Sequence, residues 1–556
     1  MAHHGWVVEL DPKGLTPDSL KSPFGRLFAA RDHEYDSLGI SFLAGALGPM
    51  QESSLAGLPA PSPAKPANPA GFTFLGQFVD HDMTEFRVVG DDLKLIESNP
   101  VIAKRQRVLE DVRRPEGTIS VTTTNGRTGK LDLDSVYGLL GTAQPDLFDA
   151  GGNFRLHNDE DIMRGAAFKN SRLIADPRND ENKLIAQIHI LFEKLHNTIH
   201  ATKSGAPSEI GPSGPIFLET KAQVVAAYQR IVLHDYVPRI VRAEQIDAVL
   251  EKLEEGETRY QAMNARNRHL LRELGLDQLD IDATVAVPVE FSHAVFRLGH
   301  SQLRNGYLLR SGQPGVPLFE TNLGGNDLRG NKPLNPGGGG TNFLVQWRHF
   351  FKLVSTNPQP GNAIDGNLPN SIFRLPPPAI GEPPVSLAER NIRRGVDFGL
   401  PSGQIAAAEF STTYGFIDPT PLSILFPDPI FQPKAEVLER AANLQWETPL
   451  WYYILKEAGA YTAGPQLGTV GGLVVAETLI GSIVEARLAQ KRLEDPVGFN
   501  EEAETARIVG DIRTERSTLN PDGHDIGSGP LSFSTNPSDH ANIFTMSQLI
   551  RYVGAN

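Results

Sequence analysis

Residues 74–86, FLGQFVDHDMTEF, place one histidine between two aspartates inside an otherwise apolar run. Histidine and aspartate are costly to bury without hydrogen-bond or charge partners. If this stretch is a helix, Gln77 and His81 share one face, because residues four apart on a helix are neighbours. Asp80 lies beside them, whereas Asp82 points about 200° away from Asp80 at roughly 100° per residue. The two aspartates therefore need two different partners.

A second stretch, TGKLDLDSVYG (128–138), alternates oxygen-bearing groups along an expected loop. Thr128, Asp132 and Asp134 carry side-chain oxygens, and the backbone carbonyl of Lys130 lies between them. Hard oxygen ligands suit Ca²⁺, which takes about six to eight of them, although the pattern is not that of an EF-hand. For both stretches the simpler alternative is structural: local caps and a core histidine in the first, and a solvated acidic turn in the second.

The composition is that of an ordinary water-soluble protein. Of 556 residues, 40% are hydrophobic and 21% are charged, and the formal net charge of −14 argues against nucleic acid or an anionic membrane as partner. The lack of cysteine excludes disulfides, thiolate metal sites and a cysteine nucleophile. The N-terminus has no signal-peptide core, and Glu477 interrupts the apolar run at 467–484, which predicts a buried helix and no membrane span. We therefore expect a soluble protein that is cytoplasmic or is secreted without a signal peptide.

Helical periodicity dominates the rest of the chain. Apolar residues of 183–202 fall on one stripe of an amphipathic helix. Further helices are expected at 220–255, 257–275, 343–354, 434–458, 470–492 and 500–514, and a capping-box pattern at Thr545 and Gln548 predicts a last one. Proline-rich residues 57–71 predict an extended arm. The expected fold is mainly α with long loops and little β structure, divided into an N-terminal arm (1–70) and one large domain (71–556).

Two groups of histidines have simple structural interpretations when taken alone. One is a polar stripe on the 183–202 helix, formed by His189, Glu193, His196 and His200. Its spacing is similar to that of a zinc or di-iron helix, but the chain has no HExxH. The other is His300, which is most simply a core or surface histidine. We expect a structural role for the stripe.

A resemblance to the animal-type haem peroxidases of the peroxidase–cyclooxygenase superfamily, which includes myeloperoxidase, lactoperoxidase and peroxinectin, is carried by several motifs together. They are FLGQFVDHD, LDLDSVYG, DPRNDE (176–181), IHILFEKLHN, VFRLGH and RNIRRGVDFGLPSG (390–403). The resemblance spans roughly residues 70 to 485. It implies a helix bundle that sandwiches haem b, and a peroxidase that reduces H₂O₂ and oxidises small organic donors, halides or thiocyanate. Without cysteine or a signal peptide, a microbial, non-secreted member is expected.

The resemblance implies a role for each residue beneath the haem. His300 matches the proximal iron ligand, and Asn391 matches the residue that hydrogen-bonds the other nitrogen of that histidine. Arg297 and Arg394 match residues beside the haem propionates, where guanidinium groups pair well with carboxylates.

On the opposite face, the resemblance implies that His81 is the catalytic base, which takes a proton from peroxide and returns it to the leaving oxygen. Arg178 matches the residue that stabilises the developing charge, and Gln77 would hold water or a halide. Asp80 and Glu181 match the carboxylates that form ester links to haem methyl groups.

The resemblance also gives the second aspartate of the opening stretch its partner. The implied Ca²⁺ ligands are Asp82, Thr128, the Lys130 carbonyl, Asp132 and Asp134. Asp80 would thus tether haem, His81 would act on peroxide, and Asp82 would anchor its helix to a calcium loop whose ion offsets the buried negative charge.

Three departures refine these expectations. Asn182 replaces the methionine that makes a third haem link in myeloperoxidase, so that link cannot form. Asp134 stands where many members have serine, and it keeps an oxygen ligand. Arg297 occupies the position of the radical-forming tyrosine of cyclooxygenases and fatty-acid dioxygenases. Two rival functions stay open: a haem-dependent fatty-acid dioxygenase, and a haem- and calcium-bearing adhesion or scaffold protein without turnover. The sequence does not define the electron donor, the halide or the oligomeric state.

Overall fold

The structure is a computed structural model that describes every residue of the predicted site. The described residues are 24–31, 35, 37–45, 48–52, 67–88, 123–138, 145–168, 172–273, 285–319, 326–336, 341–353, 356–375, 386–415, 417–425, 442–518, 541 and 543–555. Residues 57–66 of the predicted arm and residues 434–441 of one predicted helix lie outside this set.

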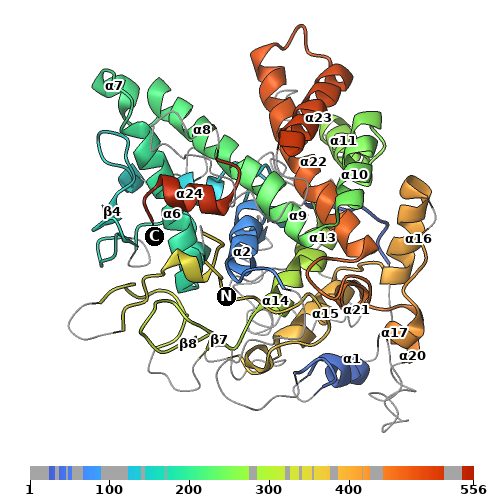
Figure 1. The fold of residues 1–556 in the computed structure, drawn as a ribbon. Helices are drawn as coiled ribbons and strands as arrows, with labels where there is room; N and C mark the ends of the chain where they lie inside the picture. The colour runs from blue at the N-terminus through green and yellow to red at the C-terminus, as the bar shows by residue number, and fades with distance from the viewer. Residues whose placement is uncertain are drawn as a thin grey trace.

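The opening stretch forms helix α2 (Gly71–Met83), which lies at the centre of the molecule (Figure 1). Eleven of its thirteen residues are buried, and the two that are partly exposed are Gln77 and Asp80. No side chain caps its first turn, but the amide of Gly71 donates to the carbonyl of Phe350 at 3.0 Å. A helix buried on nearly all sides needs apolar residues around most of its circumference, which this sequence supplies.

Neighbouring helices enclose α2. Helix α6 (Lys183–His200) packs along it, and the rings of Phe78 and Phe192 stack with centroids 5.1 Å apart. The short helix α14 (Gly299–Gln302) contacts it from another element of the chain. The π-helical turn η4 (Val232–Tyr236) comes so close that a side chain at position 76 would collide with the Tyr236 hydroxyl, which explains the glycine there.

The remaining helices surround this centre (Figure 1). In the first half of the chain they are α1 (Ser37–Ala44), α5 (Asp134–Tyr137), α7 (Pro207–Ile210), α8 (Pro215–Ile231), α9 (Val237–Ile240), α10 (Ala243–Glu255), α11 (Arg259–Glu273) and α13 (Val289–His293). In the second half they are α15 (Leu387–Asp397), α16 (Gly403–Tyr414), α17 (Leu422–Leu425), α20 (Ala442–Trp446), α21 (Leu450–Tyr461), α22 (Thr469–Glu494), α23 (Glu501–Thr518) and α24 (Met546–Tyr552). Helices α10, α11, α22 and α23 stand together at one end.

Short 3-10 turns and strand pairs complete the described elements. The 3-10 turns are η1 (Pro145–Leu147), η3 (Pro177–Asp180), η5 (Val295–Leu298), η6 (Trp347–His349) and η7 (Asn370–Ile372). The strands form two-stranded pairs: β1 (Phe24–Gly25) parallel to β6 (Val287–Pro288), and the antiparallel pairs β2 (Phe86–Val88) with β3 (Thr123–Asn125), β4 (Leu156–His157) with β5 (Asp161–Ile162), and β7 (Gly306–Tyr307) with β8 (Val316–Pro317). The prediction of a mainly α fold with little β structure is confirmed.

Several predicted helices are confirmed with small shifts at their ends. They are 183–202 (α6), 257–275 (α11), 470–492 (α22) and 500–514 (α23). The predicted capping box is also present before α24. The Gln548 amide donates to Thr545 Oγ1 at 3.2 Å, and the Thr545 amide donates to Gln548 Oε1 at 3.0 Å.

Other predicted helices differ. The helix expected at 220–255 is divided into α8, η4, α9 and α10. The helix expected at 343–354 is wrong, because the described part of this segment has only the 3-10 turn η6. Its backbone amides are used elsewhere: Phe343 donates to the Leu334 carbonyl, and Gln346 donates to the Leu309 carbonyl. Within 442–458, helices α20 and α21 are separate because Pro449 precedes α21.

Residues 24–52, which belong to the predicted N-terminal arm, contribute β1, α1 and buried side chains such as Leu27 and Phe28. The backbone amides of Leu27 and Phe28 donate to the buried carboxylate of Glu290 at 3.1 and 3.2 Å. The domain boundary at residue 70 stays a prediction.

The predicted buried helix at 467–484 is confirmed as part of α22. By length and composition this helix could cross a membrane, yet 89% of its most apolar stretch is buried inside the protein. Glu477 is fully buried there and accepts hydrogen bonds from the Tyr414 hydroxyl at 2.6 Å and the Tyr260 amide at 2.9 Å.

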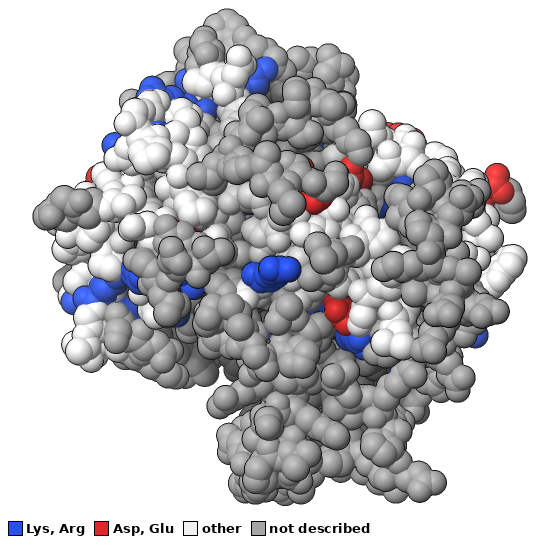
Figure 2. All heavy atoms as spheres, turned by 90° about the horizontal axis from the view of Figure 1, so that it is seen from below, with Lys and Arg blue, Asp and Glu red and all other residues white. Residues whose placement is uncertain are grey.

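One face of the molecule, seen in Figure 2, shows how charge is distributed. Basic and acidic side chains are scattered over the described part of this surface and are separated by uncharged groups. Among the described residues on this face, neither sign forms a continuous patch.

Candidate active site

Several partly exposed residues lie together beside the central helix. Gln77 and Asp80 on α2, Glu181 after η3, and Arg297 and His300 on η5 and α14 are all partly exposed, although most of their neighbours are buried. Helix α2 contacts both η3 and α14, so these residues surround one region. A Cβ placed on the glycine before His300 would meet no atom within 4 Å. The structure therefore brings together residues from three distant motifs around open space.

His81 is buried within this group, with 2% of its surface exposed. Its Nδ1 lies 2.9 Å from Oδ1 of Asn179. Burial and the Arg178 charge lower the pKa of His81, so its imidazole is neutral near pH 7. Since an amide oxygen only accepts, Nδ1 carries the proton and Nε2 keeps its lone pair. His81 can therefore act as a base through Nε2.

Arg178 lies on η3, one 3-10 turn before Glu181, and residues three apart on such a turn share a side. Its guanidinium contacts the backbone of the His81 helix end: Nη2 donates to the His81 carbonyl at 2.7 Å and Nη1 to the Thr84 carbonyl at 2.5 Å. The sequence predicted a position beside His81. The structure adds that Arg178 donates to main-chain carbonyls near His81, whereas the His81 imidazole is hydrogen-bonded to Asn179.

The sequence interpretation missed Asp176, which holds Arg178. Its carboxylate accepts from Arg178 Nη2 at 2.6 Å and lies 2.8 Å from Nη2 of Arg127. Burial alone would raise the pKa of Asp176, but these two guanidinium groups hold it well below its usual range. Asp176 also caps η3 ahead of Pro177, and an aspartate directly before a proline is a recognisable helix-start signal.

Asn391, on α15, connects the proximal residues. Its Nδ2 lies 2.8 Å from Nδ1 of His300, and its Oδ1 accepts from Arg297 Nη1 at 3.3 Å. Burial and the charges of Arg297 and Arg394 lower the pKa of His300 to about 3, so this imidazole is also neutral. The four residues predicted on this side are thus assembled into one cluster.

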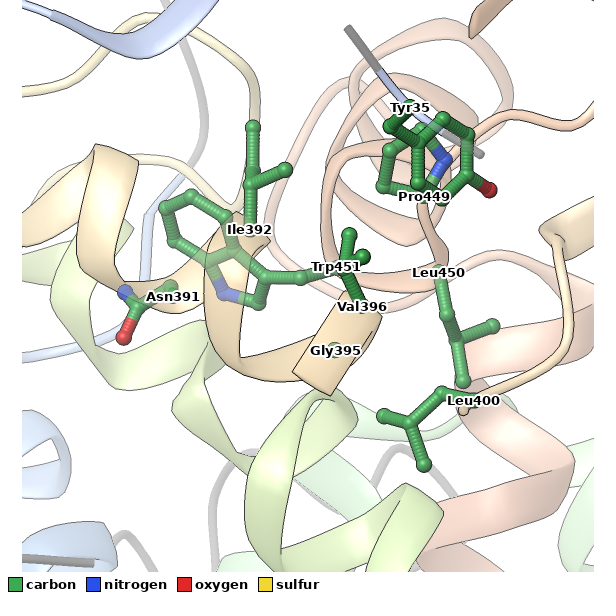
Figure 3. A pocket seen from close by; sticks show the side chains of 9 residues that line it. All are labelled: Tyr35, Asn391, Ile392, Gly395, Val396, Leu400, Pro449, Leu450 and Trp451. Atoms are coloured by element: carbon green, nitrogen blue, oxygen red, sulfur yellow. The ribbon is translucent and has the colours of Figure 1, made fainter. Parts of the chain in front are cut away.

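A side-chain cap and close packing against α21 hold helix α15 in place. Ser386 caps it, because Oγ accepts from the Glu389 amide at 3.3 Å. Ile392 and Trp451 line a cavity of about 10 Å³ between α15 and α21. In Figure 3 the Asn391 amide points away from these apolar side chains. The cavity has room for about one water molecule, so the helix is closely packed.

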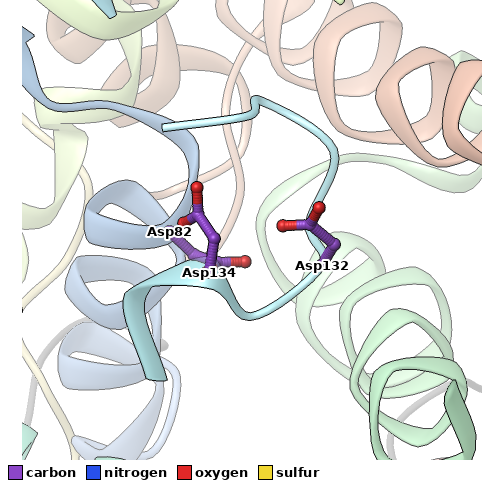
Figure 4. A group of neighbouring side chains, drawn as sticks. All are labelled: Asp82, Asp132 and Asp134. Atoms are coloured by element: carbon purple, nitrogen blue, oxygen red, sulfur yellow. The ribbon is translucent and has the colours of Figure 1, made fainter. Parts of the chain in front are cut away.

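Three aspartates converge at the C-terminal end of α2, directly after His81 (Figure 4). Asp82, Asp132 and Asp134 each offer an oxygen within 4.8 Å of the others. Asp82 is fully buried and accepts from the amides of Leu133 and Ser135 at 3.1 and 3.2 Å. Burial and the charge of Asp132 raise the pKa of Asp82 to about 6. Carboxylates this close repel one another unless a cation or proton lies between them.

The loop that carries two of these aspartates has an unusual backbone. Gly129, Leu131 and Leu133 have φ angles of 69°, 52° and 59°. A left-handed leucine costs roughly 1–2 kcal/mol, so the loop needs compensation. Both leucines are fully buried, and Thr128 Oγ1 donates to Asp132 Oδ1 at 2.8 Å. Because Leu131 and Leu133 alternate with polar residues, the leucine side chains lie in the core and the polar side chains lie together, as the sequence pattern suggested.

The histidine stripe of α6 is buried and hydrogen-bonded. His196 Nδ1 lies 2.9 Å from the Tyr137 hydroxyl, and His200 Nδ1 lies 3.1 Å from Thr220 Oγ1. These contacts fit the structural role expected for those two histidines.

Comparison with known proteins agrees with this geometry. Residues 60–402 match the model of the family described as animal haem peroxidase. The chain belongs to the animal haem peroxidase family. This family consists of oxidoreductases and implies a haem cofactor, which confirms the resemblance inferred from the motifs.

The fold is shared with a solved structure of a peroxidase. Peroxidase A from Dictyostelium discoideum superimposes with a TM-score of 0.54 at 13% identity, over 96% of this chain and 93% of that chain. Fatty acid alpha-dioxygenase from Oryza sativa has a TM-score of 0.47 at 13% identity, over 89% and 80%. The enzyme of that name from Arabidopsis thaliana has a TM-score of 0.47 at 14% identity, over 94% and 78%. A comparison with curated proteins finds no similar sequence.

Proposed function

We propose that this protein is a haem peroxidase that reduces H₂O₂ and oxidises small organic donors, halides or thiocyanate. The observation that carries the proposal is the state of His81, a buried neutral imidazole whose Nδ1 is held by Asn179 and whose Nε2 keeps a lone pair. Nε2 takes a proton from one peroxide oxygen and delivers it to the other, which then leaves as water. The family match supports this reaction class.

The residues present fit a haem. His300 offers a neutral imidazole next to open space, and Arg297 and Arg394 offer positive charge for the propionates. When bound, haem would supply the redox chemistry, in which peroxide is reduced by two electrons that the donor finally replaces.

On the proximal side, a histidine that binds iron through Nε2 carries its proton on Nδ1 and needs an acceptor there. The amide group of Asn391 faces Nδ1 of His300 with its nitrogen, and a half-turn of the amide presents its oxygen instead and gives up the contact of Oδ1 with Arg297 Nη1. In our proposal Asn391 accepts this proton's hydrogen bond in the loaded enzyme.

On the peroxide side, Arg178 supports His81. The charge of its guanidinium, fixed by Asp176, stabilises the negative charge that develops as the O–O bond breaks. Gln77 shares a face with His81 and is partly exposed, so it would hold water or a halide there.

Asp80 and Glu181 are proposed to form ester links to the haem edge. Both carboxylates are partly exposed, and Thr84 Oγ1 donates to Asp80 Oδ1 at 3.2 Å, which orients that side chain. Asn182 offers no sulfur for a third link.

Asp82, Thr128, the Lys130 carbonyl, Asp132 and Asp134 are proposed to bind Ca²⁺. The donor set is all oxygen, as this ion prefers. Asp134 Oδ1 is buried and accepts no hydrogen bond among the described residues, with Arg127 Nη1 3.5 Å away. A cation would satisfy that oxygen and offset the mutual repulsion of the carboxylates.

The peroxidase proposal is preferred over a fatty-acid dioxygenase because Arg297 stands three residues before His300, where the dioxygenase pattern needs a tyrosine. The Arg297 guanidinium is also engaged with Asn391. A tyrosyl radical formed on addition of a fatty acid would reverse this preference.

The proposal is tested by the absorption spectrum of the purified, haem-supplemented protein before and after one equivalent of H₂O₂. The wild type is expected to bind haem and change its spectrum with peroxide, and to oxidise a phenol repeatedly. His300→Ala is expected to lose the wild-type spectrum. A wild-type protein that binds haem without responding to peroxide would refute the peroxidase and leave a scaffold role.

A further inference from the structure

A chain of buried polar side chains leads from His81 into helix α6. His81 Nδ1 lies 2.9 Å from Asn179 Oδ1, and Asn179 Nδ2 lies 3.1 Å from Nδ1 of His189. His189 Nε2 lies 3.1 Å from Glu193 Oε1, one turn further along the helix. All four side chains are at most 3% exposed. We call these residues the Glu193 relay.

The relay has a direction, which follows from the carboxylate at its end. A carboxylate only accepts hydrogen bonds, so His189 donates to Glu193 through Nε2. The amide nitrogen of Asn179 faces Nδ1 of His189 and donates to it, so Nδ1 is the acceptor. The amide oxygen therefore faces His81, which must donate through Nδ1. The donor and acceptor of each hydrogen bond are thus fixed by the neighbouring bond nearer to Glu193.

We propose that Asn179, His189 and Glu193 are positioning residues that set the tautomer of His81 and so keep Nε2 unprotonated for peroxide. This inference rests on the proposed peroxidase function, and it assigns a role to a glutamate and a histidine that the sequence pattern treated as structural. The relay also fixes the imidazole plane, because a buried hydrogen bond at Nδ1 restrains rotation of the ring.

The alternative is that the relay only satisfies buried polar groups. One observation favours positioning. Asn179 is fully buried and both ends of its amide contact imidazole nitrogens, so a reversed amide would place donor against donor at His81. The same helix also offers His196, a buried histidine that hydrogen-bonds outside the relay and serves as a matched control.

The direct test is nitrogen-15 NMR of the full-length, haem-loaded protein labelled at histidine and held in the ferrous, carbon monoxide-bound state, which is diamagnetic. Chemical shifts of the two ring nitrogens distinguish the neutral tautomers, and the His81 signals are assigned by their loss in His81→Gln. The wild type is expected to carry the His81 proton on Nδ1. Asn179→Leu, similar in size but unable to accept, is expected to move that proton to Nε2.

Stopped-flow mixing of the ferric protein with H₂O₂ gives the second readout. Asn179→Leu is expected to slow the reaction on the order of 10²-fold, because the base nitrogen is blocked. Glu193→Gln removes the group that fixes the direction, and it is expected to give a mixture of tautomers and a rate about 10-fold lower. His196→Gln is expected to keep the wild-type tautomer and rate.

The inference is overturned if the wild type carries the proton on Nε2, or if Asn179→Leu and Glu193→Gln both keep the Nδ1 proton. Glu193→Gln preserves the test should Asn179→Leu fail to fold. A wild-type protein that is inert to peroxide but shows the expected tautomer shifts would refute the peroxidase proposal alone. Slow variants with unchanged tautomers would show that the relay acts only through stability.

Discussion

Arg178 is fixed by Asp176: Nη2 donates to Oδ2 at 2.6 Å, and Nε lies 3.1 Å from both carboxylate oxygens. The same carboxylate lies 2.8 Å from Arg127, whose guanidinium also reaches Asp134 at 3.5 Å. One buried acid thus connects Arg178, through Arg127, with the aspartate cluster. The position of the Arg178 charge is therefore set by a residue that does not face the proposed haem.

Replacing Asp176 should show how much it contributes to stability and how much to the position of the Arg178 charge. Asp176→Asn keeps the shape but leaves two buried guanidinium groups without their shared charge. We expect the free energy of unfolding to fall by about 3 kcal/mol and the reaction with H₂O₂ to slow on the order of 10²-fold. Urea unfolding and stopped-flow mixing measure the two effects.

A matched control is Glu485→Gln, which breaks the buried ion pair between Glu485 and Arg268 at 2.9 Å in the contact of α11 with α22. It should lower stability without slowing the peroxide reaction. An Asp176→Asn protein that reacts with peroxide as fast as the wild type would show that Arg178 does not depend on Asp176.

Removal of Ca²⁺ should destabilise the protein. If the ion is present at about 100 times its dissociation constant, binding contributes about 2.7 kcal/mol, so a calcium chelator should lower the Tm by several degrees. Asp82→Asn should lower the Tm in calcium and abolish the response to chelator. Differential scanning calorimetry with elemental analysis checks this, and a wild-type Tm that ignores the chelator would count against the site.

The ester links should depend on one carboxylate each. After incubation with haem and H₂O₂, wild-type haem should stay with the polypeptide through denaturation and acid–organic extraction. Asp80→Asn and Glu181→Gln should each lose one link, and the double variant should release its haem. Mass spectrometry of haem-bearing peptides identifies the attachment points. Full release of haem from the wild type would remove the links from the account while leaving the peroxidase intact.

Stability should depend on pH through the buried Glu457, which accepts from the amides of Val470 and Gly471 at the start of α22. Burial raises the pKa of Glu457 from 4.5 to about 7. Between these values the unfolded chain ionises while the folded carboxyl stays protonated, so the free energy of unfolding falls as pH rises and stays lower above pH 7. The loss between pH 5 and pH 8 should be about 2–3 kcal/mol.

Urea unfolding of the wild type and Glu457→Gln at both pH values isolates the contribution of Glu457. Other groups that titrate, such as Glu477, are present in both proteins, so their effect cancels in the comparison. The variant should lose less stability than the wild type on going to pH 8. Equal losses in the two proteins would show that Glu457 does not titrate in this window.

The sequence was informative where local pattern and motif agree. The apolar run around His81 predicted a buried helix, and the alternation at 128–134 predicted converging oxygens. Both predictions rest on periodic patterns of side chains along the chain, and the folded structure preserves these patterns. The segment 343–354 misled because its apolar residues suit a helix, whereas its amides are taken by distant carbonyls. Partners of that kind have no local signal.

The supporting residues of the site were harder to predict. Asn179 and Asp176 lie within three residues of Arg178, yet their roles depend on His81 and Arg127 from other parts of the chain. Only the helix-start pattern at Asp176 could have identified one of them. Hydrogen bonds between distant segments are set by packing, and spacing along the chain does not encode them.

The most direct test of the whole account is the rate at which haem-loaded His81→Ala reacts with H₂O₂, compared with the wild type in the same stopped-flow experiment. We expect a loss of at least about 10²-fold, with the haem spectrum before mixing retained because His300 is unchanged. A variant that reacts at the wild-type rate would contradict the assignment of His81 as the base and, with it, the proposed mechanism.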